Sequence, residues 1–422
     1  MPFTPAKGTT RPGSVATVIA SFLHFDISFT IWVILGSLSV YITPTLHLMP
    51  AQQGLMVAIP TLSGSLMRIP MGLLSDRFSG KSVGTGMLLF LFLPLLVGWL
   101  LPVQLPGLIV VGLMLGVAGA SFAVALPLAS RWYPPSQQGL VMGISAAGNI
   151  GTVIANLFAP TLAKTFGWHA VLGFTMIPLA LVLVAFLLLA KDSPDRPAAE
   201  PIGRYLRVMS KGDLWWFCLL YSVTFGGFVG LGTFLPQFFH NQYGLSGVTA
   251  GYLTATAAFT GSTLRPLGGF LADRLGGVRT LTLLLLLIVA LYVLAALLLP
   301  IGIAGTLFVF GVAVLGLGNG SVFQLVPQRF RGEIGIATGL VGAIGGLGGF
   351  LLPILLGNIK QSSGSYASGW LVLAGYALLA LLALAMLSFS RPDWRSSFGT
   401  SKPKEQESAP APVIVEVPQA QA

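Results

Sequence analysis

The stretch that decides the fold is Arg68-Ile-Pro-Met-Gly-Leu-Leu-Ser-Asp76-Arg77, because it returns later as Arg265-Pro-Leu-Gly-Gly-Phe-Leu-Ala-Asp273-Arg274. The two stretches lie 197 residues apart. The same offset of 197 lays Gly148-Asn149-Ile150-Gly151 on Gly345-Gly346-Leu347-Gly348. Two unconnected motif pairs that share one offset are hard to explain by chance. The chain is therefore expected to be a duplication, with a site between its halves.

The sequence around these stretches is that of a membrane protein. Of its 422 residues, 55% are hydrophobic and 8% are charged, whereas a soluble domain carries about 25% charged residues. Apolar runs of roughly 20 residues recur from Val15 to Ser390, and each is long enough to cross the bilayer as a helix. A β-barrel is excluded because the runs lack the apolar/polar alternation of a barrel wall.

The runs predict an all-α membrane protein of twelve transmembrane helices, arranged as two pseudo-symmetric six-helix halves. The predicted spans are 15–41, 52–75, 82–101, 107–130, 138–163, 168–190, 214–238, 248–272, 280–300, 303–327, 334–358 and 367–390. They divide the chain into a polar N-terminus (1–14), a first half (15–190), a polar linker (191–213), a second half (214–390) and a tail (391–422). The Pro/Ala/Gln-rich tail is expected to be disordered.

The basic residues predict the orientation. Eighteen of the 22 Lys and Arg residues lie at the termini or in the loops that follow even-numbered spans, and the opposite loops hold only Lys164 and Lys360. By the positive-inside rule, the N-terminus, the linker and the tail are cytoplasmic, and the protein is expected to be a multi-pass protein of the inner membrane.

Several function classes have no support in the sequence. The net charge of +10 is spread over short loops and forms no stripe that would bind nucleic acid. The lone Cys218 cannot form an internal disulfide, and no metal-ligand cluster accompanies it. No phosphate-binding loop or nucleophile elbow is present. We therefore expect no metal, no cofactor and no enzyme activity.

Arg68 and Arg265 are the basic residues that lie inside spans, in the second and the eighth. A cation at the centre of a transmembrane helix costs about 2.5–3.5 kcal/mol on insertion scales. A guanidinium is permanently charged, and its planar fork of donors can hold two oxygens of a flat anion. We therefore expect the two arginines to clamp one small anion. The alternative is that each pairs with a carboxylate or with backbone carbonyls, although Asp26 is the only acid within a span.

A resemblance supports the transporter interpretation. The Gly-rich loops that carry Asp-Arg after spans two and eight, at 72–81 and 269–279, resemble the cytoplasmic-loop motif of the major facilitator superfamily. The resemblance extends over residues 15–390. It implies secondary active transport by alternating access and a monomeric carrier in the lipid bilayer.

Within that superfamily, the paired arginines and the glycine segments Gly143-Ile-Ser-Ala-Ala-Gly-Asn-Ile-Gly151 and Gly339-Leu-Val-Gly-Ala-Ile-Gly-Gly-Leu-Gly348 resemble the nitrate/nitrite porter family. In these porters the Asn of this segment faces the anion, which implies the same for Asn149; on residue chemistry alone, helix packing explains Asn149 equally well. The family places a Tyr hydroxyl and an aromatic wall at Tyr221 and Phe225, and Phe122 would form the opposing wall. For isolated aromatic residues, core packing is the alternative.

The glycines are expected to have a mechanical role. Glycine accounts for 53 of the 422 residues, well above the average of about 7%. Bare backbone along span eleven would let helices of the two halves pack closely and rock, although static packing is equally consistent. The glycines assigned to gating or packing are Gly143, Gly148, Gly151, Gly339, Gly342, Gly345, Gly346 and Gly348.

Coupling and latching residues complete the prediction. Asp26 is a candidate proton carrier, because intramembrane carboxyls form proton relays; a structural role, including neutralising one of the arginines, is equally open. The stretch Phe25-Asp26-x-Ser28-Phe29-x-x-Trp32 resembles the shorter, proton-coupled branch of the porters. At the cytoplasmic edge, the acids of two pairs are expected to latch helices through their neighbouring arginines or through helix ends. These pairs are Asp76 with Arg77 and Asp273 with Arg274.

The sequence thus predicts uptake of nitrate, and of nitrite, coupled to protons. Electroneutral nitrate/nitrite exchange, which requires no titratable group, is the alternative. Paired arginines would repel the organic cations that a drug/proton antiporter of this fold carries, and the short loops leave no room for the signalling domain of a membrane sensor.

Overall fold

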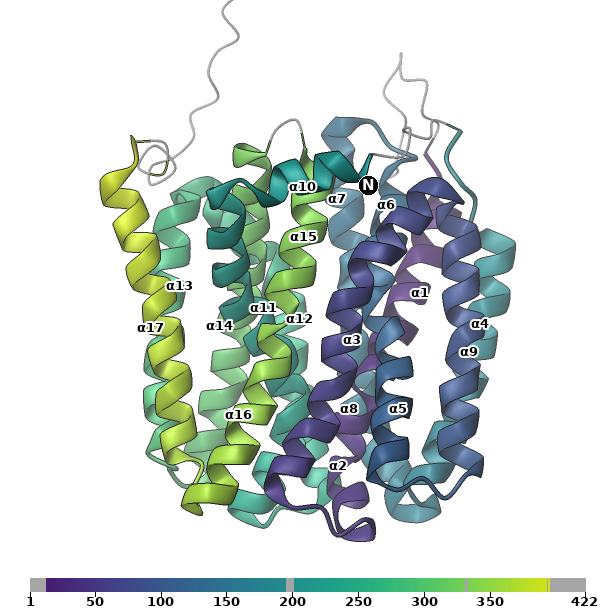
Figure 1. The fold of residues 1–422 in the computed structure, drawn as a ribbon, viewed down its shortest axis with the longest axis vertical. Helices are drawn as coiled ribbons and strands as arrows, with labels where there is room; N and C mark the ends of the chain where they lie inside the picture. The colour runs from purple at the N-terminus through teal and green to yellow at the C-terminus, as the bar shows by residue number, and fades with distance from the viewer. Residues whose placement is uncertain (1–12, 195–200, 331–332, 393, 395–422) are drawn as a thin grey trace, which may run out of the picture.

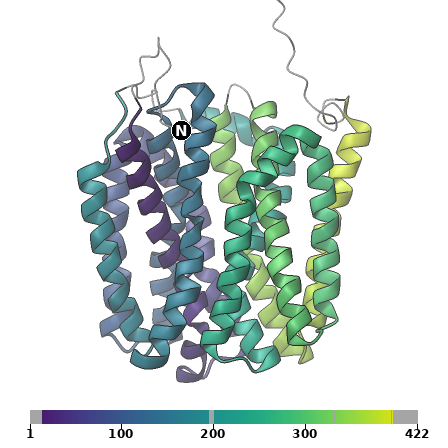
Figure 2. The same cartoon turned by 180° about the vertical axis from the view of Figure 1, so that it is seen from behind.

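The computed structural model describes residues 13–194, 201–330, 333–392 and 394, and every regular element within them is a helix. Figures 1 and 2 show two bundles standing side by side, the first half in purple and blue and the second in green and yellow. The predicted N-terminal segment and C-terminal tail lie almost wholly outside the described residues.

The first half consists of α1 (Val15–Trp32), α2 (Ile34–Thr45), α3 (Pro50–Arg77), α4 (Gly80–Leu100), α5 (Leu105–Leu115), the 3-10 segment η1 (Gly116–Ser121), α6 (Phe122–Ser130), α7 (Pro135–Ala146), the 3-10 segment η2 (Ala147–Ile150), α8 (Gly151–Phe166) and α9 (Trp168–Leu189). The linker contains α10 (Ile202–Met209), which lies across one end of the bundle (Figure 1). The second half consists of α11 (Gly212–Tyr243), α12 (Gly247–Leu275), α13 (Gly277–Ala296), α14 (Ile301–Arg329), α15 (Ile334–Gly346), α16 (Gly348–Ser363) and α17 (Ala367–Ser390).

Consecutive helices join into longer rods, so that the described residues form the twelve predicted spans with ends shifted by at most five residues. The joined rods are α1–α2, α5–η1–α6, α7–η2–α8 and α15–α16. Eleven of the twelve are long and apolar enough to cross a membrane. The twelfth, α12, is long enough but carries Arg265 and many Thr and Gly residues, which lower its apolar character.

Spans five and eleven are interrupted at equivalent points, at η2 and at Leu347, and Ile150 and Leu347 differ by the repeat offset of 197. Each interruption packs on the first helix of its own half. A side chain at Gly151 would overlap the Asp26 carbonyl on α1, and one at Gly348 would overlap the Ser222 carbonyl on α11. The duplication in the sequence is therefore expressed as the same local packing in both halves.

The glycines of span eleven divide into two groups. A side chain at Gly345 would collide with Tyr221 of the same half, whereas one at Gly346 would collide with Ser65 of the other half. Close packing between the halves, as expected from the sequence, thus applies to Gly346. Side chains at Gly143 and Gly339 would meet nothing within 4 Å, so these two glycines lie in the less tightly packed end of the bundle, toward the linker.

The opposite end of the bundle is closed by uncharged contacts between the halves. Between the halves, the Asn241 amide on α11 donates to the Gln53 side chain on α3 at 3.2 Å; within the second half, it donates to the Tyr366 hydroxyl, also at 3.2 Å. The Thr43 hydroxyl on α2 donates to the Gln237 side chain on α11 at 3.4 Å. The structure therefore has a tight seam at one end and a looser end beside the linker.

Helix α12, which carries Arg265, is held against α14 by glycine contacts. A side chain at Gly316 would overlap the Gly261 carbonyl, and one at Gly268 would overlap the Leu317 carbonyl. Because both obstacles are backbone atoms, they cannot move aside without shifting a helix. The glycines thus fix the distance between the two helices.

We expect Gly316→Ala to destabilise the protein by about 1–3 kcal/mol, because an added methyl group in a close-packed helix interface strains the backbone. The measurement is the apparent unfolding temperature in detergent. Gly302→Ala is the control on the same helix, since a side chain there meets nothing within 4 Å. Equal unfolding temperatures for the two variants would contradict this account.

Candidate functional site

Arg68 lies on α3 at the interface of the two halves and is 2% exposed. Its Nε donates to the Gly119 carbonyl of η1 at 3.1 Å, and its Nη1 donates to the Gly342 carbonyl of α15. Its Nη2 is buried and has no hydrogen-bond partner among the described residues. The guanidinium therefore connects the halves through backbone carbonyls and keeps one donor group unused.

Three aromatic rings surround the Arg68 guanidinium. Its central carbon lies 5.5 Å from the centre of the Trp32 ring, 5.5 Å from that of Phe122 and 4.9 Å from that of Phe225. Cations are attracted to the faces of aromatic rings, most strongly where water is excluded. Rings and carbonyls, and no carboxylate among the described residues, hold this charge. The alternative interpretation was that each arginine pairs with a carboxylate or with backbone carbonyls. For Arg68, the structure contains the pairing with backbone carbonyls.

Arg265 lies on α12 and is partly buried, with its central carbon 5.7 Å from the centre of the Phe323 ring. Its Nη1 is buried without a hydrogen-bond partner within the described part of the chain. The centre of the Tyr221 ring lies 4.8 Å from that of Phe323, which faces Arg265. It also lies 4.9 Å from that of Phe225, which faces Arg68. The structure therefore places Arg68 and Arg265 on one cluster of rings that contains Tyr221.

The predicted aromatic walls are present as pairs of stacked rings. Tyr221 and Phe225 are parallel within 2°, with ring centres 4.9 Å apart. Phe122 stacks on Phe323 at 6.0 Å with an angle of 21°. The first pair lies on α11, and the second joins α6 of the first half to α14 of the second.

Asn149 is 1% exposed, and its Oδ1 has no hydrogen-bond partner in the described residues. It lies on η2, which packs against α1 and against α12, the helix of Arg265. The structure records no contact between Asn149 and either guanidinium, so its assignment to the site stays a prediction.

Asp26 forms no ion pair within the described residues, and its buried Oδ1 has no hydrogen-bond partner there. Neutralisation of an arginine, one alternative for this residue, is therefore not observed. The Thr30 hydroxyl donates to the Asp26 carbonyl at 3.0 Å and to the Gly151 carbonyl at 3.1 Å. Asp26 thus lies where α1 contacts the interruption of span five.

Four parts of the site were not predicted from the sequence. Trp32 ends the stretch 25–32, but no feature of the sequence placed it in the site. The carbonyls of Gly119 and Gly342 could not be predicted, because every residue has a backbone carbonyl. Phe323 could have been found through the repeat, because the position equivalent to Phe122 is Asn319, one turn before it on α14. Asn319 is itself 1% exposed, and its Oδ1 has no partner within the described residues.

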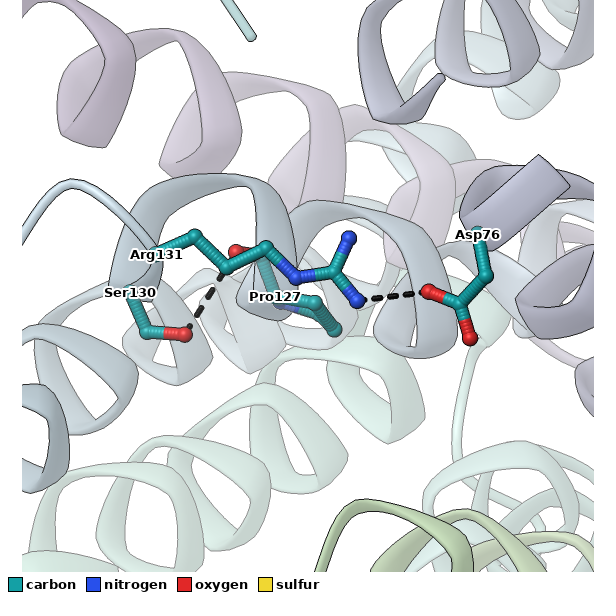
Figure 3. Close-up of polar contacts among 4 residues, drawn as sticks. All are labelled: Asp76, Pro127, Ser130 and Arg131. Carbon is teal, nitrogen blue, oxygen red and sulfur yellow. Dashed lines mark hydrogen bonds and ion pairs between the residues drawn. The ribbon is translucent and has the colours of Figure 1, made fainter. Parts of the chain in front are cut away.

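The predicted latch residues have partners other than those expected. Asp76 pairs with Arg131, at the end of α6, at 2.5 Å and not with Arg77 (Figure 3). Asp273 accepts a hydrogen bond from Gln324 on α14 at 2.8 Å, while Arg274 lies over the Phe270 ring. Of the two predicted kinds of partner, the neighbouring arginines are not used in the described part of the chain, because adjacent helical residues point in different directions; Asp76 instead reaches a residue at the end of another helix. Each acid still joins two helices, α3 to α6 and α12 to α14.

Together, the fold and the site define a polytopic helical carrier whose two related halves meet at a cationic, ring-lined centre. The sequence matches the family model "Major Facilitator Superfamily" over residues 20–353. It is 36% identical over 360 residues to the nitrite extrusion protein of Bacillus subtilis, covering 84% of this chain and 89% of that protein. It is 34% identical over 383 residues to the probable nitrate/nitrite transporter NarK2 of Mycobacterium tuberculosis, covering 89% and 96%.

A solved structure agrees on the fold. A bacterial homologue of the human lysosomal transporter Spinster, in an inward-facing and occupied conformation, superposes with a TM-score of 0.69 at 20% identity, covering 89% of this chain and 97% of that chain. The chain therefore belongs to the Major Facilitator Superfamily, in the group that contains these nitrate and nitrite transporters. The family is one of transporters and not of enzymes, as the sequence predicted.

We expect Arg131→Asp to destabilise the protein by about 1–3 kcal/mol, because it replaces a partly buried ion pair with two facing acids. The double variant Asp76→Arg/Arg131→Asp should recover part of the loss, as measured by the apparent unfolding temperature. The pair Arg391–Asp213, whose Arg391 side chain is 48% exposed, is the control and should respond less to the same reversal. If the apparent unfolding temperature of the double variant were no higher than that of Arg131→Asp alone, the pairing of Asp76 with Arg131 would be ruled out.

Proposed function

We propose that this protein carries nitrate and nitrite across the membrane by alternating access, with one anion bound between Arg68 and Arg265. The observation that carries the proposal is that two guanidinium groups, one from each half, lie against one cluster of rings formed by Phe225, Tyr221 and Phe323. Each of these guanidinium groups keeps a buried N–H group without a partner in the described residues. Relatives named as nitrate and nitrite transporters at 34–36% identity support the choice of anion.

The chemistry of the site suits a small flat oxyanion. The free Nη2 of Arg68 and the free Nη1 of Arg265 can each donate to a different oxygen of one ion, and the Tyr221 hydroxyl can donate to a third. Hydrogen bonds to charged groups contribute about 1.5–3 kcal/mol each. The stacked rings keep water out, which strengthens these interactions, and favour a planar ion over a bulky one.

Anion binding would also act on the contact between the halves. Arg68 Nη1 donates to the Gly342 carbonyl of the opposite half, and this carbonyl partly compensates the buried charge when no anion is bound. An anion that draws the guanidinium toward itself would weaken this bond. The bond between Arg68 and the Gly342 carbonyl would then be replaced by a connection between the halves that runs through the bound anion.

Uptake requires coupling, because moving a monovalent anion into a negative-inside cell costs about 2.3 kcal/mol per 100 mV. We favour proton symport, with Asp26 as the carrier, over nitrate/nitrite exchange. Support comes from the position of Asp26 on the contact between α1 and η2, the segment that carries Asn149. A change of charge at Asp26 could thus be transmitted to the substrate-facing segment.

The same proposal places a monomeric carrier in the inner membrane, with both termini and α10 on the cytoplasmic side. Support comes from the distribution of Lys and Arg, of which 18 of 22 lie at that face. In this orientation the closed seam of Gln53, Asn241 and Tyr366 faces outward, and the structure is closed to the outside.

Arg68→Lys tests the anion site, because lysine keeps the charge and loses the planar fork. Loss of one charged hydrogen bond should raise the KM for nitrate about 10- to 100-fold. The measurement is uptake of labelled nitrate into proteoliposomes. Arg274→Lys, in the last turn of α12, is the control and should retain the wild-type KM. An unchanged KM in Arg68→Lys would argue against bidentate recognition.

Asp26→Asn tests the coupling, because the amide cannot carry a proton. We expect uptake driven by a pH gradient to be lost while exchange of internal nitrite for external nitrate continues at a rate near that of the wild type. The two activities are measured in the same proteoliposomes, with the membrane potential clamped. If the Asp26→Asn variant took up nitrate at the wild-type rate when driven by a pH gradient, Asp26 would be excluded as the proton carrier and exchange would be favoured.

A further inference from the structure

Trp32 is the last residue of α1 and is 1% exposed. Its indole Nε1 donates to the Pro60 carbonyl of α3 at 2.7 Å, which satisfies its only polar group. The Phe29 ring packs edge-on against it at 5.0 Å between ring centres. The indole therefore has a fixed orientation between α1 and α3.

The indole occupies the space above two glycines. A side chain at Gly64 on α3 would lie 2.6 Å from the indole nitrogen, and one at Gly119 on η1 would overlap the ring. Trp32 thus packs on both α3 and the 3-10 segment η1, which also meet directly where Gly64 faces the Gly116 carbonyl. The Gly119 carbonyl at this contact is the acceptor for Arg68 Nε at 3.1 Å.

Trp32 also contacts the site directly through its ring face. The Arg68 guanidinium lies 5.5 Å from the ring centre. The ring stacks on Phe225 of the other half at 6.5 Å and 26°, and Phe225 in turn stacks on Tyr221. A row of three stacked rings therefore extends from α1 to Tyr221, whose ring packs edge-on against Phe323 beside Arg265.

We infer that Trp32 is a positioning residue for anion recognition. It holds the Arg68 guanidinium in two ways, through its own ring face and through the Gly119 carbonyl. In this pose Nη2 is the group left without a partner in the described residues and is available to the anion. Trp32 thereby sets the affinity for the anion and does not touch it through a polar group. The inference rests on the proposed function, because it assigns a role within the same anion site.

The test is a double-mutant cycle between Trp32→Phe and Arg68→Lys, read as the KM and maximal rate of nitrate uptake. Phenylalanine keeps an aromatic face but loses the bond to Pro60 and leaves space above the glycines. We expect Trp32→Phe to raise the KM about 5- to 20-fold with the maximal rate changed less than about twofold. In the Arg68→Lys background it should raise the KM by no more than about twofold, because the fork that it positions is already gone.

Trp99→Phe is the control. Trp99 lies outside the site but also packs on a glycine, because a side chain at Gly173 would lie 2.6 Å from the indole ring. This variant should leave the KM unchanged. Additive effects of Trp32→Phe and Arg68→Lys, or a fall in maximal rate alone, would reduce Trp32 to a packing residue and overturn the inference. If Trp32→Phe is recovered in poor yield, Trp32→Tyr serves in the same cycle with the same criterion. Wild-type protein that transports no nitrate would instead overturn the proposed function.

Discussion

The constraint on which the rest of the structure depends is the presence of two permanent positive charges in the membrane interior. A guanidinium cannot shed its charge, so burial must be compensated by acceptors, by polarisable rings or by a bound anion. Arg68 receives two carbonyls and three rings, and no carboxylate within the described residues. This compensation is incomplete, because one donor group stays without a partner there. The proposed anion site rests on this uncompensated donor group.

Glycines allow the backbone to provide that partial compensation. A carbonyl can approach a buried guanidinium only if the segment that carries it lies close to the helix of the arginine. The contact of Gly64 with the Gly116 carbonyl brings η1 to α3, and the contact of Gly316 with the Gly261 carbonyl brings α14 to α12. These glycines are therefore part of the electrostatics of the site as well as of its packing. Their high number in the sequence reflects helices that meet backbone to backbone.

The sequence predicted the spans and the paired arginines because both follow from local or repetitive signals. Bilayer thickness fixes the length of an apolar run, and the offset of 197 links Arg68 to Arg265 without any tertiary information. Partners could not be predicted in the same way. Asp76 pairs with Arg131, 55 residues away, and the Gly342 carbonyl lies 274 residues from Arg68. Such contacts depend on how helices pack, and a backbone carbonyl leaves no trace in residue identity.

The duplicated site is unequal in its two halves, and the inequality has a mechanical consequence. Arg68 is 2% exposed and enclosed by three rings, whereas Arg265 is partly buried beside Phe323 and Tyr221. Where the first half places the ring of Phe122, the second half places the buried amide of Asn319. Two of the groups that hold Arg68, the Gly342 carbonyl and the Phe225 ring, belong to the opposite half, whereas the Phe323 ring beside Arg265 belongs to the same half as Arg265. Movement of one half against the other would therefore change the contacts of Arg68, while the contact of Arg265 with Phe323 would move with its own half.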